Sequence, residues 1–154
     1  QEVSMKLGHK TFSKLVTSIA CTLTLVFSVN AVAQSGTFRA RLSPMPTTPQ
    51  TVTTITGEGE VILTLEGNTL KVTGDFVGMN SAATMAHVHN GPPAQPGPVV
   101  HQLEVTKMTG GEISAVLELT DEQVMALHNN ELYIQVHSET NPPGELRGWV
   151  FARN

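Results

Sequence analysis

The chain from Gly36 onward is cut into short segments of alternating apolar and polar residues, each bounded by Gly, Pro or Asn. Successive side chains of a β-strand point to opposite faces, so alternation buries one face and exposes the other. Closely spaced segments of this kind are typical of all-β domains. The pattern predicts strands over 37–42, 51–56, 59–65, 69–76, 85–89, 99–105, 112–119, 131–137 and 145–151. We therefore expect a single all-β domain.

One short helix is predicted to interrupt the strands. The segment Thr120-Asp-Glu-Gln123 fits a capping box, with Leu119 and Val124 placed to form a hydrophobic staple. The pattern predicts that the helix ends near 128–130. Two proline-rich stretches, 43–50 and 90–98, are predicted to be surface loops, because proline lacks the N–H that a sheet interior requires.

The first part of the sequence has the features of a secretory signal peptide over residues 5–33. A basic stretch starts at Met5, an apolar run covers 15–29, and the small residues 31–33 form a cleavage motif. The apolar run is too short to be a convincing membrane span. Cleavage would leave residues 34–154 as one periplasmic or extracellular domain without a membrane anchor.

The predicted mature domain is acidic and lacks cysteine. Residues 34–154 contain 6 Lys and Arg against 12 Asp and Glu, a net charge of 6 − 12 = −6. Such a surface argues against nucleic acid as a partner. The only cysteine, Cys21, lies within the signal peptide. The mature domain is therefore expected to have no disulfide and no thiolate ligand, which excludes a blue-copper site.

Two histidines on one predicted strand suggest a metal site. In Met85-Ala-His-Val-His89, the side chains of Met85, His87 and His89 share one face, while the small apolar residues between them can face a core. The two imidazoles are then roughly 7 Å apart at their Cβ atoms. Their ring nitrogens could converge on one ion at about 2 Å each.

A third histidine occupies an equivalent position on a second strand. The apolar residues of 132–137 alternate, which places His137 on the face opposite to them. If this strand neighbours 85–89, the imidazoles of His87, His89 and His137 meet outside the core as a plausible ligand set. The alternative is that these histidines only cap the sheet or bond to the proline-rich loop.

The sequence pattern supports the other candidate ligands less strongly. His101 shares a face with the apolar residues of 99–105, which fits a half-buried histidine bonded to backbone as well as a fourth ligand. The thioether of Met85 could serve copper(I) or simply fill a gap. His128 is placed to interact with the C-terminal end of the helix dipole. An all-nitrogen set favours copper or zinc, and the Irving–Williams order favours copper; the alternative is that no metal binds.

Signals for catalysis are absent from the sequence. There is no nucleophile elbow, no phosphate-binding loop and no pair of carboxylates arranged for acid–base chemistry, so no catalytic residue is predicted. Glu145 and Arg147 share a face with Trp149 and are predicted to form a structural ion pair. Alternatively, Glu145 could orient an imidazole as a hydrogen-bond acceptor.

A set of ordered motifs resembles the chordin-type CHRD domain. The motifs are Ala86–Pro92, Gly97–Val100, Leu119–Gln123, Leu132–His137 and Asn141–Gly148. The resemblance covers the chain from about Gly36 and implies an immunoglobulin-like or Greek-key antiparallel β-sandwich with one short helix. It also implies an extracellular setting, because the animal domain lies within chordin, an antagonist of bone morphogenetic proteins, and microbial members are secreted.

The histidine pattern is also similar to that of copper/zinc superoxide dismutase. By position, His87 and His89 match its His-x-His pair, His101 its bridging histidine and His137 its later ligand. The mature chain lacks the disulfide and the zinc-loop cluster of that family. The similarity therefore supports a metal on a sandwich face and not dismutation.

Three functions follow from these patterns. The first is binding of copper, or of zinc, through surface histidines, in metal storage, delivery or surface binding. The second is a non-catalytic module that binds another protein or assembles with itself. The third is an enzyme resembling superoxide dismutase, which only the similarity of fold supports.

Overall fold

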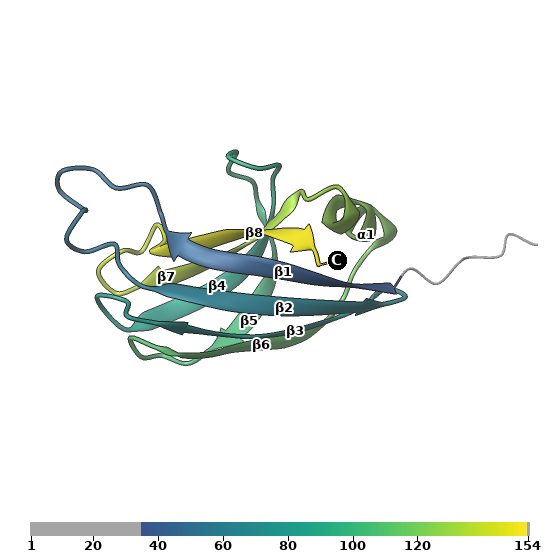
Figure 1. Ribbon diagram of the computed structural model, residues 1–154, viewed down its shortest axis with the longest axis horizontal. Coiled ribbons are helices and arrows are strands. Elements are labelled where there is room, and N and C mark those ends of the chain that lie inside the picture. Colours follow the sequence, from purple (N-terminus) through teal and green to yellow (C-terminus); the bar gives the residue numbers. More distant parts are fainter. Residues whose placement is uncertain (1–34, 154) are drawn as a thin grey trace, which may run out of the picture. The chain divides into compact units, whose positions relative to one another are not determined.

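The computed structural model describes residues 35–153, so the signal peptide predicted over 5–33 lies outside the described residues. Eight strands and one helix make up this part of the chain (Figure 1). In order they are β1 Ser35–Pro44, β2 Glu58–Glu66, β3 Thr69–Val77, β4 Ala83–Asn90, β5 Val99–Val105, β6 Gly111–Glu118, α1 Asp121–His128, β7 Leu132–Ser138 and β8 Leu146–Ala152.

The eight strands form one closed antiparallel barrel in the order β1-β2-β3-β6-β5-β4-β7-β8. The prediction of an all-β, antiparallel fold is confirmed, and the neighbouring strands β3-β6-β5-β4 have the order of a Greek key. The immunoglobulin-like sandwich was wrong, because the described strands form one closed barrel and not a pair of open sheets. Closure depends on β8 pairing with β1, and on β5 meeting β6 through Glu104–Ser114 and Val105–Ile113. Alternation cannot distinguish the two architectures, because both bury one face of every strand.

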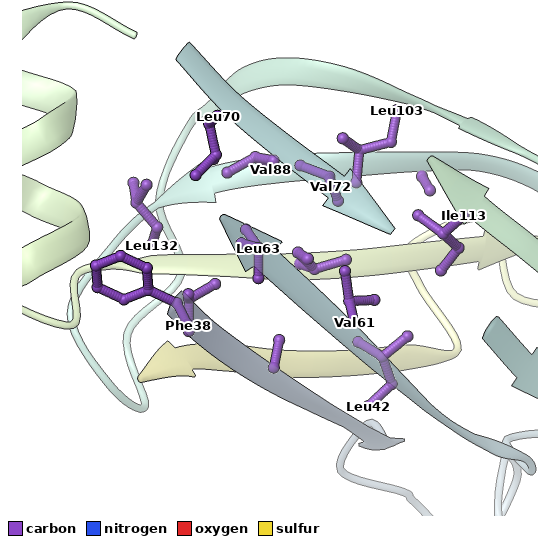
Figure 2. Packing of buried hydrophobic residues seen from close by; sticks show 14 of the residues in the cluster. Phe38, Leu42, Val61, Leu63, Leu70, Val72, Val88, Leu103, Ile113 and Leu132 are labelled. Carbon is purple, nitrogen blue, oxygen red and sulfur yellow. The ribbon is translucent and has the colours of Figure 1, made fainter. Parts of the chain in front are cut away.

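Alternating apolar residues fill the barrel interior (Figure 2). Leu63 of β2, Leu70 of β3, Val88 of β4 and Leu132 of β7 are fully buried. Complete burial of a side chain of this size contributes about 1.5–3 kcal/mol. The inward faces therefore fix which residues point outward, and on β4 and β7 the outward residues include histidines.

Residues 51–56 were predicted to be a strand and instead form local turns. The Thr51 N–H donates to the Thr48 carbonyl at 3.0 Å, and the Ile55 N–H donates to the Thr51 carbonyl at 2.9 Å. β-Branched residues made this stretch look extended. It has no strand to join, because β1 and β2 are already paired on both sides.

The helix has the predicted capping box. The Gln123 N–H donates to Thr120 Oγ1 at 3.3 Å, and the Thr120 N–H donates to Gln123 Oε1 at 3.1 Å. Leu119 and Val124 are both buried, as the staple requires. His128 lies in the last turn, as predicted, and its ring packs edge-on against Phe38 with centroids 5.3 Å apart. No helix within residues 35–153 is long and apolar enough to span a bilayer.

Candidate metal centre

β4 and β7 are neighbouring antiparallel strands, which brings their outward residues together (Figure 1). The register places Met85 opposite His137, His87 opposite Gln135 and His89 opposite Tyr133. The intervening apolar residues face the core and are fully buried. The histidines of both strands therefore share one outer face.

Three imidazoles converge on this face. His87, His89 and His137 each offer one ring nitrogen, and these nitrogens all lie within 4.8 Å of one another. His87 Nδ1 is 3.1 Å from His137 Nε2. Bonds of about 2.0–2.1 Å in a tetrahedral site separate nitrogen ligands by roughly 3.3 Å. This pair already has the spacing of two ligands, and binding would draw the third ring closer.

Backbone carbonyls orient two of the rings. His137 Nδ1 lies 2.8 Å from the Pro142 carbonyl, and His89 Nδ1 lies 2.9 Å from the Gly97 carbonyl. A carbonyl only accepts, so each neutral ring carries its proton on Nδ1 and keeps a lone pair on Nε2. His89 Nε2 is buried and has no hydrogen-bond partner. A metal ion would satisfy this lone pair. Histidine ligands of metals usually donate their other N–H to a carbonyl, as His89 does to Gly97.

Aromatic residues hold the loop 91–98 against the site. The Tyr133 ring stacks on His89, with centroids 4.6 Å apart and planes at 11°. Its hydroxyl accepts from the Gly97 N–H at 3.1 Å and donates to the Gly97 carbonyl at 3.3 Å. Trp149 Nε1 donates to the Gly91 carbonyl at 3.0 Å. The carbonyl that orients His89 is therefore fixed by side chains of β7 and β8.

The environment favours neutral imidazoles. Burial lowers the pKa of His87 below its ordinary value of 6.5, and the charges of His137 and His89 lower it further. Burial is also the main reason that the pKa of His89 is lowered. The hydrogen bond to Gly97 raises this pKa, and the charges of His137 and Arg147 lower it further. Only the neutral ring has a lone pair for a metal, so these shifts keep the ligands available near neutral pH.

The lowered pKa values predict that the metal-free protein loses stability in mild acid. Well above pH 6.5, which is the ordinary pKa of both rings, they are neutral in the folded and unfolded states. As the pH falls through 6.5, the unfolded chain takes up protons before the folded chain does, so stability decreases until the folded rings also titrate. Urea unfolding in the presence of a chelator, from about pH 8 to about pH 5, should show this decrease. The double variant His87→Gln/His89→Gln should show a smaller decrease in stability. An equal dependence of stability on pH in both proteins would refute the assignment of this decrease to His87 and His89.

Gly97 is predicted to be required for the orientation of His89. A Cβ at this position would overlap the Asn90 carbonyl, a backbone atom that cannot move without displacing the loop. Gly97→Ala should weaken metal binding by about 10- to 100-fold, as expected when a group that orients a ligand is lost. Competition with a chelator would measure this. Pro93→Ala, at an exposed position of the same loop, should leave affinity unchanged; equal affinities in all three proteins would contradict the prediction.

The structure does not bring His101 to the other three histidines. His101 pairs with Val88, whose side chain is buried in the core, and its Nε2 is 2.9 Å from Gln123 Oε1 on the helix. This agrees with its apolar pattern in the sequence. Met85 lies on the histidine face, opposite His137, and is 44% exposed. Its role as a ligand stays a prediction.

Glu145 has a role that the sequence interpretation missed. Its side chain is fully buried, and Oε1 accepts from the backbone N–H groups of Thr56 and Asn80 at 3.2 and 2.7 Å. Oε2 accepts from Ser138 Oγ and from Asn141 Nδ2. Within residues 35–153 it forms no ion pair with Arg147 and no bond to an imidazole, so both predictions were wrong. The physical reason is that Glu145 precedes β8 and turns inward. The hydrogen-bonding residues Ser138 and Asn141 nearby in the sequence were the only local indication of its role.

Comparison with known proteins gives a family and no individual relative. The sequence model of a family described as CHRD domain matches residues 38–150. CHRD domains occur in extracellular proteins. Neither the curated proteins nor the solved structures contain a match to this chain.

Proposed function

This chain belongs to the CHRD domain family, and we propose that it is a secreted member that binds one transition-metal ion through His87 Nδ1, His89 Nε2 and His137 Nε2. The observation that carries the proposal is the buried, unpartnered Nε2 of His89, which belongs to a group of three converging ring nitrogens. An isolated histidine would rarely leave a buried lone pair unsatisfied.

Copper is the metal that we propose, with zinc as the alternative. Imidazole suits both ions, and copper(II) is the tighter-binding divalent ion by the Irving–Williams order. Met85 lies on the same face, opposite His137, where its thioether could serve copper(I). His87 would shift its proton from Nδ1 to Nε2 on binding, because its Nδ1 faces the lone pair of His137 Nε2 in the metal-free protein.

The proposed role is storage, delivery or surface binding of the metal outside the cytoplasm. The histidines lie on the outer face of the barrel, and His87 and Met85 are only partly covered, which provides a route for the ion from solvent. Secretion rests on the predicted signal peptide and agrees with the extracellular occurrence of the family.

The chain supplies its own reporter for the test. It has one Trp and one Tyr, and Tyr133 stacks on His89 while the Trp149 ring lies 5.2 Å from Tyr133. Copper(II) bound at the site should quench Trp149 fluorescence and saturate at one equivalent, whereas zinc, which has no redox chemistry, should compete without quenching.

Variants of this titration separate the site from other histidines. His87→Ala in the full chain, produced without a histidine tag, should abolish stoichiometric quenching. His128→Ala removes a histidine that packs on Phe38 and should leave the quenching unchanged. His101→Ala should also leave it unchanged, because His101 bonds to Gln123 on the helix; loss of quenching would instead support the fourth-ligand prediction. Quenching that never saturates, or that is equal in the wild type and in His87→Ala, would refute the proposal.

A further inference from the structure

The charges around the proposed site are unbalanced. Three neutral imidazoles leave the charge of a divalent ion uncompensated, and the candidate ligand group of residues 35–153 contains no carboxylate. A partly buried charge without a partner is unfavourable. Three ligands also leave an open coordination position, as in metal sites that bind water or substrate.

Arg147 adds a further positive charge beside this site. On β7, Gln135 pairs with His87 of β4 on one side and with Arg147 of β8 on the other. The Arg147 guanidinium carbon lies 4.6 Å from the Trp149 ring centroid and 5.8 Å from that of Tyr133, the ring that stacks on His89. Its charge contributes to the lowered pKa of His89.

The guanidinium of Arg147 has no acidic partner in the described part of the chain. The ion pair found within residues 35–153 joins Arg39 to Glu60. The guanidinium carbon lies over the Trp149 ring, and a guanidinium in contact with an aromatic face keeps N–H donors at its edge for a ligand. Arg147 is therefore a partly exposed cation that is free to bind an anion from solution.

We propose, on the basis of the proposed metal site, that its open position binds a small carboxylate from solution and that Arg147 holds this anion. With a metal ion held by the three histidines, one carboxylate oxygen would take the place of a water molecule on the ion, and the other would accept hydrogen bonds from the guanidinium. No electron is transferred, and the released water carries no charge. Carboxylate is the class that fits, because its two oxygens can bridge a metal ion and the planar fork of an arginine.

The test uses acetate as the probe and the copper(II)-loaded full chain. The copper EPR spectrum is recorded during an acetate titration in a buffer without other coordinating anions. Arg147→Gln should weaken acetate binding by about 10- to 100-fold, because a charge-assisted hydrogen bond is lost. Copper binding should be unchanged or tighter in this variant, because a positive charge near the ion is removed. Arg147→Lys, which keeps the charge and loses the fork, should lie in between.

Arg153→Gln is the matched control. Arg153 follows the same strand and is exposed. The variant removes the same charge as Arg147→Gln, but its acetate affinity should equal that of the wild type. Equal acetate affinity in the wild type and Arg147→Gln, or the absence of acetate binding to copper-loaded wild type, would overturn the inference and leave the metal site standing. Weaker binding of copper and acetate together in Arg147→Gln would also overturn it, because that result indicates a structural role. Wild-type protein that takes up no copper would refute the proposed function, and this inference with it.

Discussion

Replacing His137 with alanine is expected to weaken copper binding by more than about 100-fold, beyond the usual loss for a residue that only orients a ligand. The His137 Nε2 lies 3.1 Å from His87 Nδ1, and its orientation is set by the Pro142 carbonyl. Without the His137 ring, the two remaining imidazoles both lie on β4 and cannot enclose an ion. Competition with a chelator of known affinity would measure the loss.

The control for this prediction is the integrity of the barrel. His137 is 8% exposed, so the variant loses packing and the hydrogen bonds to Pro142 and His87, a change of about 1–3 kcal/mol in stability. Circular dichroism and thermal unfolding of the metal-free protein should therefore show a folded chain. A folded variant that keeps copper affinity within about threefold of the wild type (below one kcal/mol) would show that His137 is not a ligand.

The second large effect is expected at Glu145. Glu145→Ala should lower the free energy of unfolding by about 3–5 kcal/mol, because buried donors lose a charged acceptor. Two of those donors are the backbone N–H groups of Thr56 and Asn80, which lie in different loops. The carboxylate thus fastens the loops at one end of the barrel to the turn that follows β7. Urea unfolding would measure the change.

Two variants test this explanation. Glu139→Ala removes the same charge from an exposed position and should change stability by no more than about 0.5 kcal/mol. Glu145→Gln keeps one acceptor oxygen but turns an amide toward donors, so its loss should be intermediate. Equal stability of Glu145→Ala and Glu139→Ala would contradict the role that we assign to this group.

Local pattern was sufficient to predict which faces of β4 and β7 carry histidine. Alternation in a strand determines sidedness, so Val88 and Ile134 inside place His87 and His137 outside. Capping by Thr120 was equally visible, because it depends on residues three apart. Closure of the barrel could not be predicted in this way. It depends on β1 pairing with β8 and on β5 pairing with β6, and no local pattern encodes those pairings.

The chemistry of the site was predicted less completely than its position. The carbonyls of Gly97 and Pro142 decide which ring nitrogens are available, and both belong to proline-rich loops whose path the sequence does not specify. His101 patterned with apolar residues and indeed faces the core side. Glu145 was misjudged because a buried carboxylate is recognised by its donors, which come from distant segments.

The proposed metal site requires the imidazoles of His87, His89 and His137 to share one metal ion. X-ray absorption spectroscopy of the copper-loaded full chain, purified without a histidine tag, tests it most directly. We expect one copper per chain with imidazole scattering from three histidines, and loss of this copper when the three are replaced by alanine. A substoichiometric copper content, or a spectrum unchanged in the triple variant, would contradict it.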